Sequence, residues 1–362
     1  MKKRFYDVYP YPNLGKVVDG ILYILDYVEY YIERPVKKVL DIGCGTGEYA
    51  IAAGRRYPEM EIIGLDYSSK AIEIANKLLK KEKNNNNNVN FICEDFLNYK
   101  PKEKFDYIIC SGLIEETHWI RGFFNCIALK KLLKHDGMIG VNVRANYGIG
   151  EDVNVLKKIV DKLIKPGIDS IENKLEITKN IWNSVHEEHW LRKLISSDLI
   201  KSDTHLGALF VSDYFEIKDL FFMLDDLKSD YLKFVRFADE HLWIPEFFNL
   251  QFSKTITKKD MYELIAMIRR DIPCFEFFAS PVLKEKDWKK DKLMTSPFGA
   301  IVENKFIFFD NTVFKFDGKR IMILKFLKES HTLDEIILEI REVEPIVITE
   351  FVEMMFKHKV LI

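Results

Sequence analysis

Hydrophobic and polar positions along residues 36–145 form blocks whose spacing predicts strands and helices in alternation. Short apolar runs are typical of buried strands, and apolar residues at helical spacing are typical of amphipathic helices. The expected strands are residues 37–43, 61–68, 89–96, 105–112 and 137–145, and the expected helices are residues 49–57, 70–83 and 122–134. This alternation predicts an α/β fold, in which a parallel sheet carries helices on both faces.

A longer helical stretch follows the fifth expected strand. Residues 151–164 and 180–195 have helical spacing, and strand-like runs return only at residues 231–238 and 273–282. If both runs complete the sheet, residues 146–212 are a helical insertion after the fifth strand. Open α/β sheets bind ligands beyond the carboxyl ends of their strands. We therefore expect the insertion to lie over the binding edge.

The amino-terminal residues 1–35 precede the first expected strand. Within them, Tyr9 and Tyr11 alternate with prolines, which favour an extended backbone. Such a segment could fold over a binding site as a lid, or it could simply pack against the sheet. Residues 36–283 then form the main domain.

The carboxyl-terminal residues 284–362 begin with a charged stretch and continue with strand-like residues 305–316 and three expected helices. Thr332 with Glu335 three positions later predicts a capping box at the start of the middle helix. The pattern predicts a small winged-helix-like module. We expect it to contact protein, either a polypeptide acceptor or a second copy in a homodimer, or to support the main domain.

Composition limits the classes of partner. The 362 residues are 48% hydrophobic and 30% charged, which fits a globular protein with more than one domain. The formal net charge of -2 gives no overall attraction to nucleic acid or to an anionic membrane. Residues 285–362 are equally balanced, with 13 Lys or Arg against 14 Asp or Glu. We expect neither a nucleic-acid nor a membrane partner.

The cysteines and histidines give no sign of a metal site. The five cysteines are odd in number and include no C-x-x-C pair, which argues against both a disulfide framework and a cysteine zinc site. This usage is typical of a reducing, cytoplasmic compartment. His186 and His189 lie three positions apart, whereas the metalloprotease helix needs a spacing of four. We expect residues 186–189 to be an exposed helical turn, and we expect no metal.

The stretch VLDIGCGTGEYA, residues 39–50, carries the main chemical signal. Its glycines have the spacing G-x-G-x-G, whereas a dinucleotide fingerprint has G-x-G-x-x-G, and no Gly-Lys-Ser/Thr follows as in a P-loop. Asp41 and Glu48 flank the turn and would repel a pyrophosphate. A ligand with an ammonium and a sulfonium would tolerate both carboxylates, and S-adenosylmethionine carries both groups.

Side chains at the ends of the next strands fit the same ligand. Asp66 lies at the end of the second strand, where a carboxylate can accept hydrogen bonds from both ribose hydroxyls. Asp95 follows the third strand and can accept from an adenine amino group, while Phe96 covers the ring. Small residues at 110–112, after the fourth strand, allow close approach of the methionine part.

At these residues the chain resembles the class I S-adenosylmethionine-dependent methyltransferases. The matching segments are residues 39–50, 64–68, 92–96 and 105–112, in family order and spacing. The resemblance implies a Rossmann-like sheet, S-adenosylmethionine as cofactor and S-adenosylhomocysteine as product. The expected cofactor-binding residues are Asp41, Gly43, Cys44, Gly45, Gly47, Asp66, Tyr67, Asp95, Phe96, Cys110, Ser111 and Gly112.

The chain is also similar, more loosely, to bacterial methyltransferases with a Tyr-Pro-Tyr-Pro segment and a methyltransferase regulatory region. The segments FYDVYPYP (5–12), RANYGIG (144–150) and SDTHL (202–206) carry this likeness. The chain departs from that group at Glu115 and Glu116, where paired histidines are expected, and in the absence of a His-Pro turn after SDTHL. Some relatives methylate protein lysines, so the resemblance suggests a protein side-chain nitrogen as one acceptor class.

Candidate catalytic residues follow from the reaction. Methyl transfer is an in-line displacement, so aligning donor and acceptor supplies much of the acceleration. An amine acceptor must also lose a proton, which a carboxylate or histidine near the methyl group could take. The candidates are Glu115, Glu116 and His118, on the loop after the fourth strand, and Tyr11 of the lid segment. The alternative is that the loop residues are merely solvated.

Two functions from different classes remain open. The first is a methyltransferase acting on an unidentified acceptor. The second is a non-catalytic or weakly catalytic binding or regulatory protein that keeps the methyltransferase fold, and the glutamates at 115 and 116 favour it. Turnover of S-adenosylmethionine with an acceptor would separate the two, whereas cofactor binding alone would not.

Overall fold

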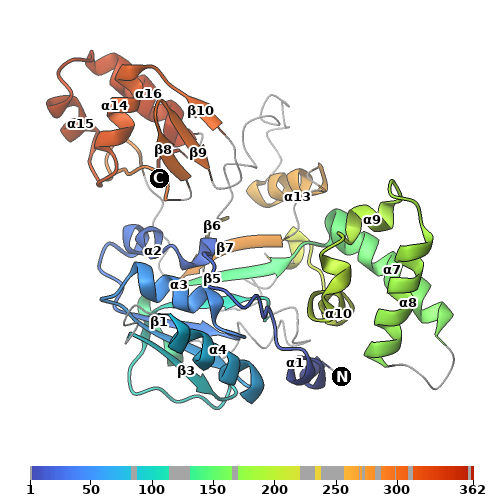
Figure 1. Ribbon diagram of the computed structural model, residues 1–362. Coiled ribbons are helices and arrows are strands. Elements are labelled where there is room, and N and C mark those ends of the chain that lie inside the picture. Colours follow the sequence, from blue (N-terminus) through green and yellow to red (C-terminus); the bar gives the residue numbers. More distant parts are fainter. Residues whose placement is uncertain are drawn as a thin grey trace.

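The computed structural model describes residues 2–82, 88–113, 131–164, 170–220, 233–237, 257–268, 270, 274–281, 287–297, 299–308, 313–357 and 360–362. These residues form a central sheet flanked by helices, a helical arm beside it and a smaller unit built from the carboxyl-terminal residues (Figure 1). No helix among these residues is long and apolar enough to cross a membrane.

The central sheet has seven strands in the order β3-β2-β1-β4-β5-β7-β6. Strands β1 to β5 are parallel, and β7 is antiparallel to both β5 and β6. The strands are β1 (Lys38–Ile42), β2 (Glu61–Asp66), β3 (Val89–Cys93), β4 (Phe105–Ser111), β5 (Leu133–Arg144), β6 (Lys233–Phe237) and β7 (Cys274–Ser280). All seven lie within or overlap the segments that the hydrophobic pattern predicts, including the two that complete the sheet after the insertion.

Strand β5 begins earlier than the sequence pattern predicts. Leu133 pairs with Phe105, and the register then shifts so that Tyr107 pairs with Met138. Residues 133 and 134 therefore belong to a strand, whereas the spacing predicted the end of helix 122–134. Pairing with the buried Phe105 overrides the local helical period. Most of that expected helix, residues 122–130, lies outside the described residues.

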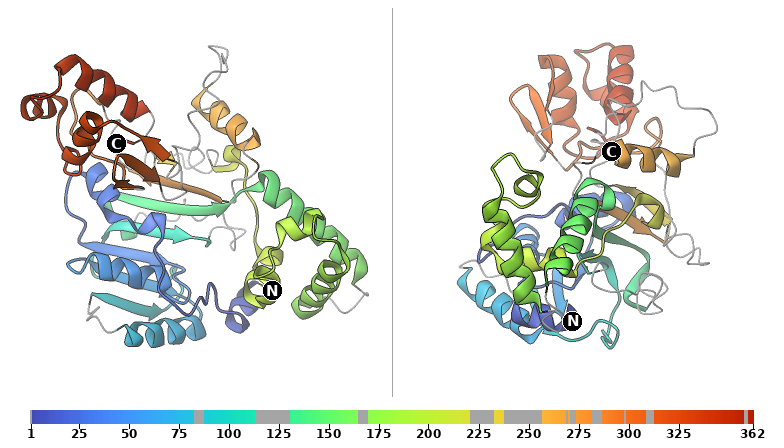
Figure 2. Two further views of the ribbon diagram at one scale, coloured as in Figure 1. Left: turned by 45° about the horizontal axis from the view of Figure 1, so that its top comes forward. Right: turned by 90° about the vertical axis from the view of Figure 1, so that its right-hand side faces the viewer.

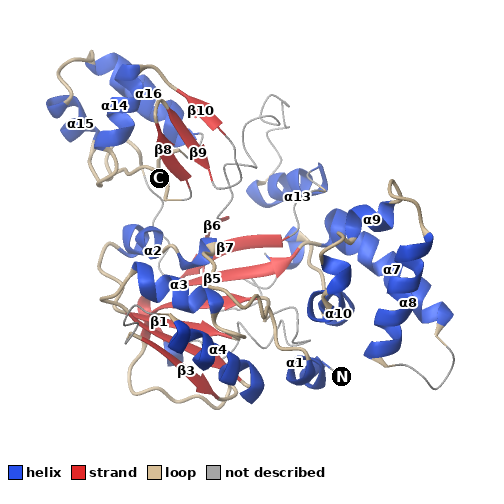
Figure 3. Cartoon of the chain, in the orientation of Figure 1, coloured by secondary structure: helices blue, strands red, loops and turns tan. Residues whose placement is uncertain are grey.

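Helices cover both faces of the sheet (Figure 3). One face packs against α2 (Leu25–Ile32), α3 (Glu48–Arg56) and α4 (Ser69–Lys81), with the short turn η1 (Ile21–Tyr23). The opposite face packs against α13 (Lys258–Ile268). Adjacent strand residues such as Val39 and Leu40 belong to different cores, because side chains alternate across a strand.

The expected helical insertion lies between β5 and β6 and has its own hydrophobic core. Its elements are η3 (Asn146–Gly150), α7 (Glu151–Leu163), α8 (Ile171–Ser184), α9 (Trp190–Leu194), η4 (Leu199–Lys201) and α10 (Asp203–Val211). The predicted helix 180–195 is wrong as a single helix. His189 instead caps α9, with its Nδ1 accepting from the Leu191 N–H at 3.3 Å, so residues 186–189 link two helices.

The amino-terminal segment joins the insertion to the sheet. Its first helix, α1 (Lys2–Val8), was not predicted from the sequence, and neither was α2. A Cβ atom on Gly207 of α10 would lie 2.5 Å from the Phe5 ring, so α1 packs closely on α10. Two views show α1 beside the insertion (Figure 2).

The carboxyl-terminal unit pairs three strands with three helices. The strands are β8 (Gly299–Val302), β9 (Lys305–Phe308) and β10 (Val313–Lys315), and the helices are α14 (Gly318–Phe326), α15 (Leu333–Glu339) and α16 (Pro345–Lys357). Strand β8 was not predicted. The capping box at Thr332 and Glu335 is confirmed. Beyond α16 the chain end is not helical, since Ile362 and Met294 exchange backbone hydrogen bonds of 3.0 and 3.1 Å.

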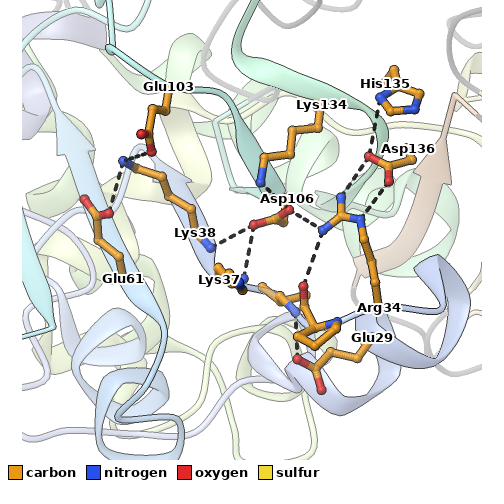
Figure 4. A network of polar contacts seen from close by, with 12 residues as sticks. Glu29, Arg34, Lys37, Lys38, Glu61, Glu103, Asp106, Lys134, His135 and Asp136 are labelled. Atoms are coloured by element: carbon orange, nitrogen blue, oxygen red, sulfur yellow. Dashed lines mark hydrogen bonds and ion pairs between the residues drawn. The ribbon is translucent and has the colours of Figure 1, made fainter.

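A buried carboxylate ties the amino ends of three strands together (Figure 4). Asp106 of β4 is fully buried and accepts from Lys134 Nζ at 2.7 Å, from Arg34 and from two backbone N–H groups at the start of β1. Arg34 also binds Asp136 through two hydrogen bonds of 2.7 and 2.8 Å. Burial alone would raise the pKa of Asp106, but the hydrogen bonds from Lys134 and Arg34 lower it below the ordinary value. This end of the sheet is thus structural.

Candidate functional site

The predicted cofactor residues gather at the carboxyl ends of β1 to β4. Strand β1 has β2 on one side and β4 on the other, so successive connections leave it in opposite directions. Doubly wound sheets bind ligands at such a switch point. One region of the molecule is therefore bordered by the loop after β1, the ends of β2 and β3, and residues 110–112 at the end of β4.

The glycine loop is held by its neighbour β2. The Gly43 and Cys44 N–H groups both donate to the Leu65 carbonyl, at 2.7 and 3.1 Å, and the Gly45 N–H donates to Asp66 Oδ2 at 3.0 Å. Gly45 has a φ of +54°, and a Cβ atom there would lie 2.0 Å from the Tyr11 carbonyl oxygen. Only glycine fits at this position without moving a backbone.

The third glycine, Gly47, allows α3 to pack closely against its neighbours. Gly47 has a φ of +81°, in the left-handed region that glycine adopts readily, and it is the residue before α3. A Cβ atom on it would lie 2.5 Å from the Phe91 ring and 2.9 Å from Ala75. The G-x-G-x-G spacing therefore lets α3 start close against β3 and α4.

Asp66 is placed as a ribose-binding residue requires. Its two carboxylate oxygens accept from the Gly45 and Ser68 N–H groups, at 3.0 and 2.8 Å. Each carboxylate oxygen can accept a further hydrogen bond, and the residue is half-buried rather than enclosed. Burial raises the pKa of Asp66 above its ordinary value, while these two backbone hydrogen bonds oppose that rise.

Asp41 and Cys44, in contrast, are buried beneath the loop. Asp41 is 1% exposed, and its Oδ2 accepts from the Tyr23 hydroxyl at 2.9 Å. Burial raises the pKa of Asp41 to about 7, against the lowering effect of that hydrogen bond. The Cys44 side chain is also buried, 3.0 Å from where a Cβ atom on Gly64 would lie. The structure places both side chains as supports of the turn, so the sequence-based expectation that they face the ligand is not supported.

The remaining predicted residues line the edge of the site. Asp95 is half-buried two residues after β3, and its Oδ1 accepts from the Leu97 N–H at 3.0 Å. Phe96 and Tyr67 are also half-buried. At the end of β4, Cys110 is buried, Ser111 and Gly112 are half-buried, and the Gly112 N–H donates to the Asn142 carbonyl at 3.1 Å. The candidate catalytic residues Glu115, Glu116 and His118 lie outside the described residues.

The Tyr-Pro-Tyr-Pro segment lies directly against the glycine loop. The Tyr11 carbonyl accepts from the Thr46 N–H at 3.1 Å, and the Asn13 N–H donates to Thr46 Oγ1 at 2.8 Å. The buried Glu48 accepts from the Leu14 N–H at 2.8 Å and from the Thr46 hydroxyl at 2.6 Å. Glu48 therefore anchors this segment to the start of α3.

Sequence reasoning missed a residue that the insertion contributes. His205 of α10 lies beside Tyr11, with ring centroids 5.3 Å apart, and its Nδ1 is 2.7 Å from Ser202 Oγ. Burial, and next the charge of Arg144, lower the pKa of His205, so the imidazole is neutral near pH 7. His205 belongs to the SDTHL segment that the sequence analysis noted, but the sequence did not show that this histidine lies beside Tyr11.

A second missed group lies on β7. Glu276 interrupts the apolar run Phe275, Phe277 and Phe278, and its Oε1 accepts from Asn142 Nδ2 at 2.9 Å. Tyr49 of α3 lies near enough for the charge of Glu276 to raise its pKa, after burial and Tyr11. The sequence could have indicated this residue, because a carboxylate inside a predicted buried strand is unusual.

The donor and acceptor groups fit S-adenosylmethionine better than a phosphate ligand. The loop presents glycine backbone, which a ligand can approach closely, and half-buried carboxylates lie at the end of β2 and just after β3. Asp66 offers acceptors for ribose hydroxyls, and Asp95 offers one for an amino group. Within the described residues, no lysine or arginine forms an ion pair with either carboxylate.

Replacing Asp66 tests this assignment. Asp66→Ala removes an acceptor of two hydroxyl hydrogen bonds, which are each worth about 1.5–3 kcal/mol when the acceptor is charged. We expect S-adenosylhomocysteine to bind at least about tenfold more weakly by calorimetry. The neighbouring exposed carboxylate gives a control, since Glu94→Ala should change affinity less than twofold. Equal affinity of Asp66→Ala and the parent would refute the ribose assignment.

Comparison with known proteins finds similarity to methyltransferases. Residues 34–188 match a protein-family model described as a methyltransferase domain. The chain is 30% identical over 126 residues to malonyl-[acyl-carrier protein] O-methyltransferase 1 of Ilyobacter polytropus, covering 34% of this chain and 45% of that protein. It is 27% identical over 139 residues to the malonyl-[acyl-carrier protein] O-methyltransferase of Bacillus cereus, covering 38% and 47%. The chain thus spans about half the length of these curated relatives.

A solved structure resembles nearly the whole chain. PKMT2 from Rickettsia typhi, in complex with AdoHcy, matches with a TM-score of 0.61 and 15% identity. The match covers 98% of this chain and 77% of that one. At this identity the likeness concerns the fold, including the insertion and the carboxyl-terminal unit.

Proposed function

We propose that this chain, in which residues 34–188 match a protein-family model described as a methyltransferase domain, transfers a methyl group from S-adenosylmethionine to an acceptor held beside the end of β4. The observation that carries the proposal is the placement of Asp66. Its carboxylate fixes the glycine loop through the Gly45 N–H and is half-buried at the strand switch point. This is the arrangement that a nucleoside with free ribose hydroxyls needs.

Binding and alignment are the chain's main contributions to the reaction. Bound S-adenosylmethionine supplies an electrophilic methyl group on a sulfonium. The glycine loop, Asp66 and Asp95 would hold the nucleoside end, and Ser111 and Gly112 leave room for the methionine part. Tyr11, whose segment is hydrogen-bonded to the loop, and His205 beside it would exclude water from the acceptor side.

For the acceptor we propose a protein side-chain nitrogen, the class that the Tyr-Pro-Tyr-Pro resemblance suggests. The near-neutral charge of the chain and of residues 285–362 supports a polypeptide over a nucleic acid. The carboxyl-terminal unit, which we still expect to be winged-helix-like, would contact the acceptor protein or a second copy of the chain. We propose a cytoplasmic location, because the five cysteines are odd in number and include no C-x-x-C pair.

Labelled methyl transfer onto fractions of a cell lysate tests the proposal. The parent chain should incorporate label into material that protease digests and nuclease does not. At S-adenosylmethionine concentrations below saturation, Asp66→Ala should incorporate at least about tenfold less, in proportion to its weaker affinity.

The rival function predicts a different outcome. A non-catalytic regulatory protein would bind S-adenosylhomocysteine, yet it would label no fraction. That result would refute the enzyme proposal and would assign the departures at Glu115 and Glu116 to loss of activity. Label that resists protease and is released by nuclease would refute the proposed acceptor class.

A further inference from the structure

Three polar residues form one row across the sheet beside the proposed methyl-transfer position. Ser111 at the end of β4 pairs with Asn142 of β5, which pairs in turn with Glu276 of β7. Neighbouring strands lie about 4.8 Å apart, so the Glu276 backbone is about 10 Å from that of Ser111. The side chains of Asn142 and Glu276 meet on the same face, 2.9 Å apart.

The surroundings of Glu276 are aromatic and polar, with no basic partner in the described part of the chain. Oε1 accepts from Asn142 Nδ2, and the residue is half-buried. Tyr49 and Tyr107 both have pKa values raised by burial and by the nearby charge of Glu276. Arg144, further along β5, is not among the groups that shift the pKa of Glu276.

A half-buried carboxylate without a cation is costly to keep charged. Burial raises the pKa of Glu276, and the Asn142 hydrogen bond only partly offsets that effect. An incoming ammonium group would pair with the carboxylate, and aromatic rings nearby stabilise such cations through their negative faces. A neutral hydroxyl or an anionic acceptor would gain neither interaction.

We infer that Glu276 binds the acceptor as a cationic amine, with Asn142 as the residue that positions its carboxylate. The inference rests on the proposed function and names the acceptor class of that site. This role also explains why β7 carries a carboxylate, Glu276, among phenylalanines.

The proton and electron balance of the step is complete with these groups. The Glu276 carboxylate takes a proton from the bound ammonium, R–NH3+, and leaves the neutral amine R–NH2. The nitrogen lone pair then forms the N–C bond to the methyl group while the C–S bond breaks. Its electron pair remains on sulfur, which gives neutral S-adenosylhomocysteine and R–NH2–CH3+. Release of the methylated ammonium and the carboxyl proton to water restores the site.

A small probe replaces the unidentified acceptor in the test. With the protein saturated by S-adenosylhomocysteine, n-butylammonium should bind saturably by NMR titration at pH 8, while neutral n-butanol should not. Glu276→Gln should weaken butylammonium binding at least about tenfold and change S-adenosylhomocysteine affinity less than twofold. Glu61→Gln, which removes an exposed carboxylate at the amino end of β2, should change neither.

The positioning role of Asn142 has its own readout. Its amide lowers the pKa of Glu276, so Asn142→Ala should move the midpoint of the pH dependence of butylammonium binding upward. Tyr49 and Tyr107 stay protonated in this range, since burial raises the pKa of each. Asp41, with a pKa of about 7, also titrates in this range. The pH dependence measured with Glu276→Gln shows how much of the effect comes from Asp41. An unmoved midpoint would refute the positioning role.

The other possible results of these titrations test the inference and the proposed function separately. No saturable butylammonium binding, or equal binding by Glu276→Gln, would overturn the inference. A tenfold loss of S-adenosylhomocysteine affinity in Glu276→Gln would also overturn it, because Glu276 would then serve the cofactor. If Glu276→Gln does not fold, Glu276→Asp decides instead, since withdrawing the charge by one methylene should weaken the probe several-fold. Failure of the parent to bind S-adenosylhomocysteine would count against the proposed function.

Discussion

Gly45→Ala is expected to weaken S-adenosylhomocysteine binding by at least about tenfold, because two independent effects act on the cofactor loop. A left-handed backbone costs an alanine about 1–2 kcal/mol relative to its preferred conformations, and Gly45 has a φ of +54°. The new Cβ atom would also lie 2.0 Å from the Tyr11 carbonyl oxygen. Because that contact is with backbone, either the loop or the Tyr-Pro-Tyr-Pro segment must move.

Gly15→Ala separates the two effects. Gly15 has a φ of +69°, and a Cβ atom there would have no neighbour within 4 Å. This variant carries the backbone cost without the collision, so it should lose stability and keep cofactor affinity within about twofold of the parent. Calorimetry for affinity and thermal unfolding for stability give both comparisons. Equal losses of affinity in the two variants would contradict the assigned contact between the loop and Tyr11.

Arg34→Met is expected to lower the free energy of unfolding by about 3 kcal/mol at pH 7. Removing one partner of a buried ion pair usually costs 3–5 kcal/mol, and the lower end applies because Arg34 is 28% exposed. Methionine keeps the aliphatic stem, so the loss reports mainly the guanidinium and its contacts with Asp106 and Asp136. Urea unfolding followed by circular dichroism measures it.

The loss should depend on pH in a defined direction. Hydrogen bonds from Arg34 lower the pKa of Asp136, and those from Lys134 and Arg34 lower that of Asp106 despite burial. A carboxyl group with a lowered folded-state pKa contributes stability above the unfolded-state pKa of about 3.9. That contribution disappears as the pH falls through the folded-state value. The difference between the parent and Arg34→Met should therefore shrink below about pH 4.

An exposed ion pair provides the control. Lys77 pairs with Glu73 on the surface of α4, where both side chains are more than 60% exposed. Such pairs between neighbouring helical turns contribute about 0.3–0.5 kcal/mol. Lys77→Met should therefore destabilise the fold far less than Arg34→Met. A comparable cost for both variants would mean that the network at the amino ends of the strands adds nothing beyond surface charge.

The sequence by itself determined the central architecture and the class of ligand. The alternation of short apolar runs with helical spacing located all seven strands, because strand and helix periods are local properties. The G-x-G-x-G spacing indicated a turn that is not the dinucleotide type, and the position of Asp66 after the second strand indicated a ribose contact. The capping box at Thr332 was equally local, since both partners lie within one turn.

Only the tertiary structure decided which side chains face the site and which support it. In the sequence, Asp41 and Glu48 look alike, as carboxylates that flank the glycine turn. In the structure, Asp41 accepts a hydrogen bond from the Tyr23 hydroxyl, whereas Glu48 accepts one from the Leu14 N–H. Glu276 and Asn142 are 134 residues apart and meet through antiparallel pairing of β5 with β7. A local pattern fixes backbone period and turn geometry, whereas burial and charge pairing depend on residues that only chain folding brings near. For that reason, the sequence was enough to indicate the cofactor, whereas the fold was needed to propose Glu276 as the residue that binds the acceptor.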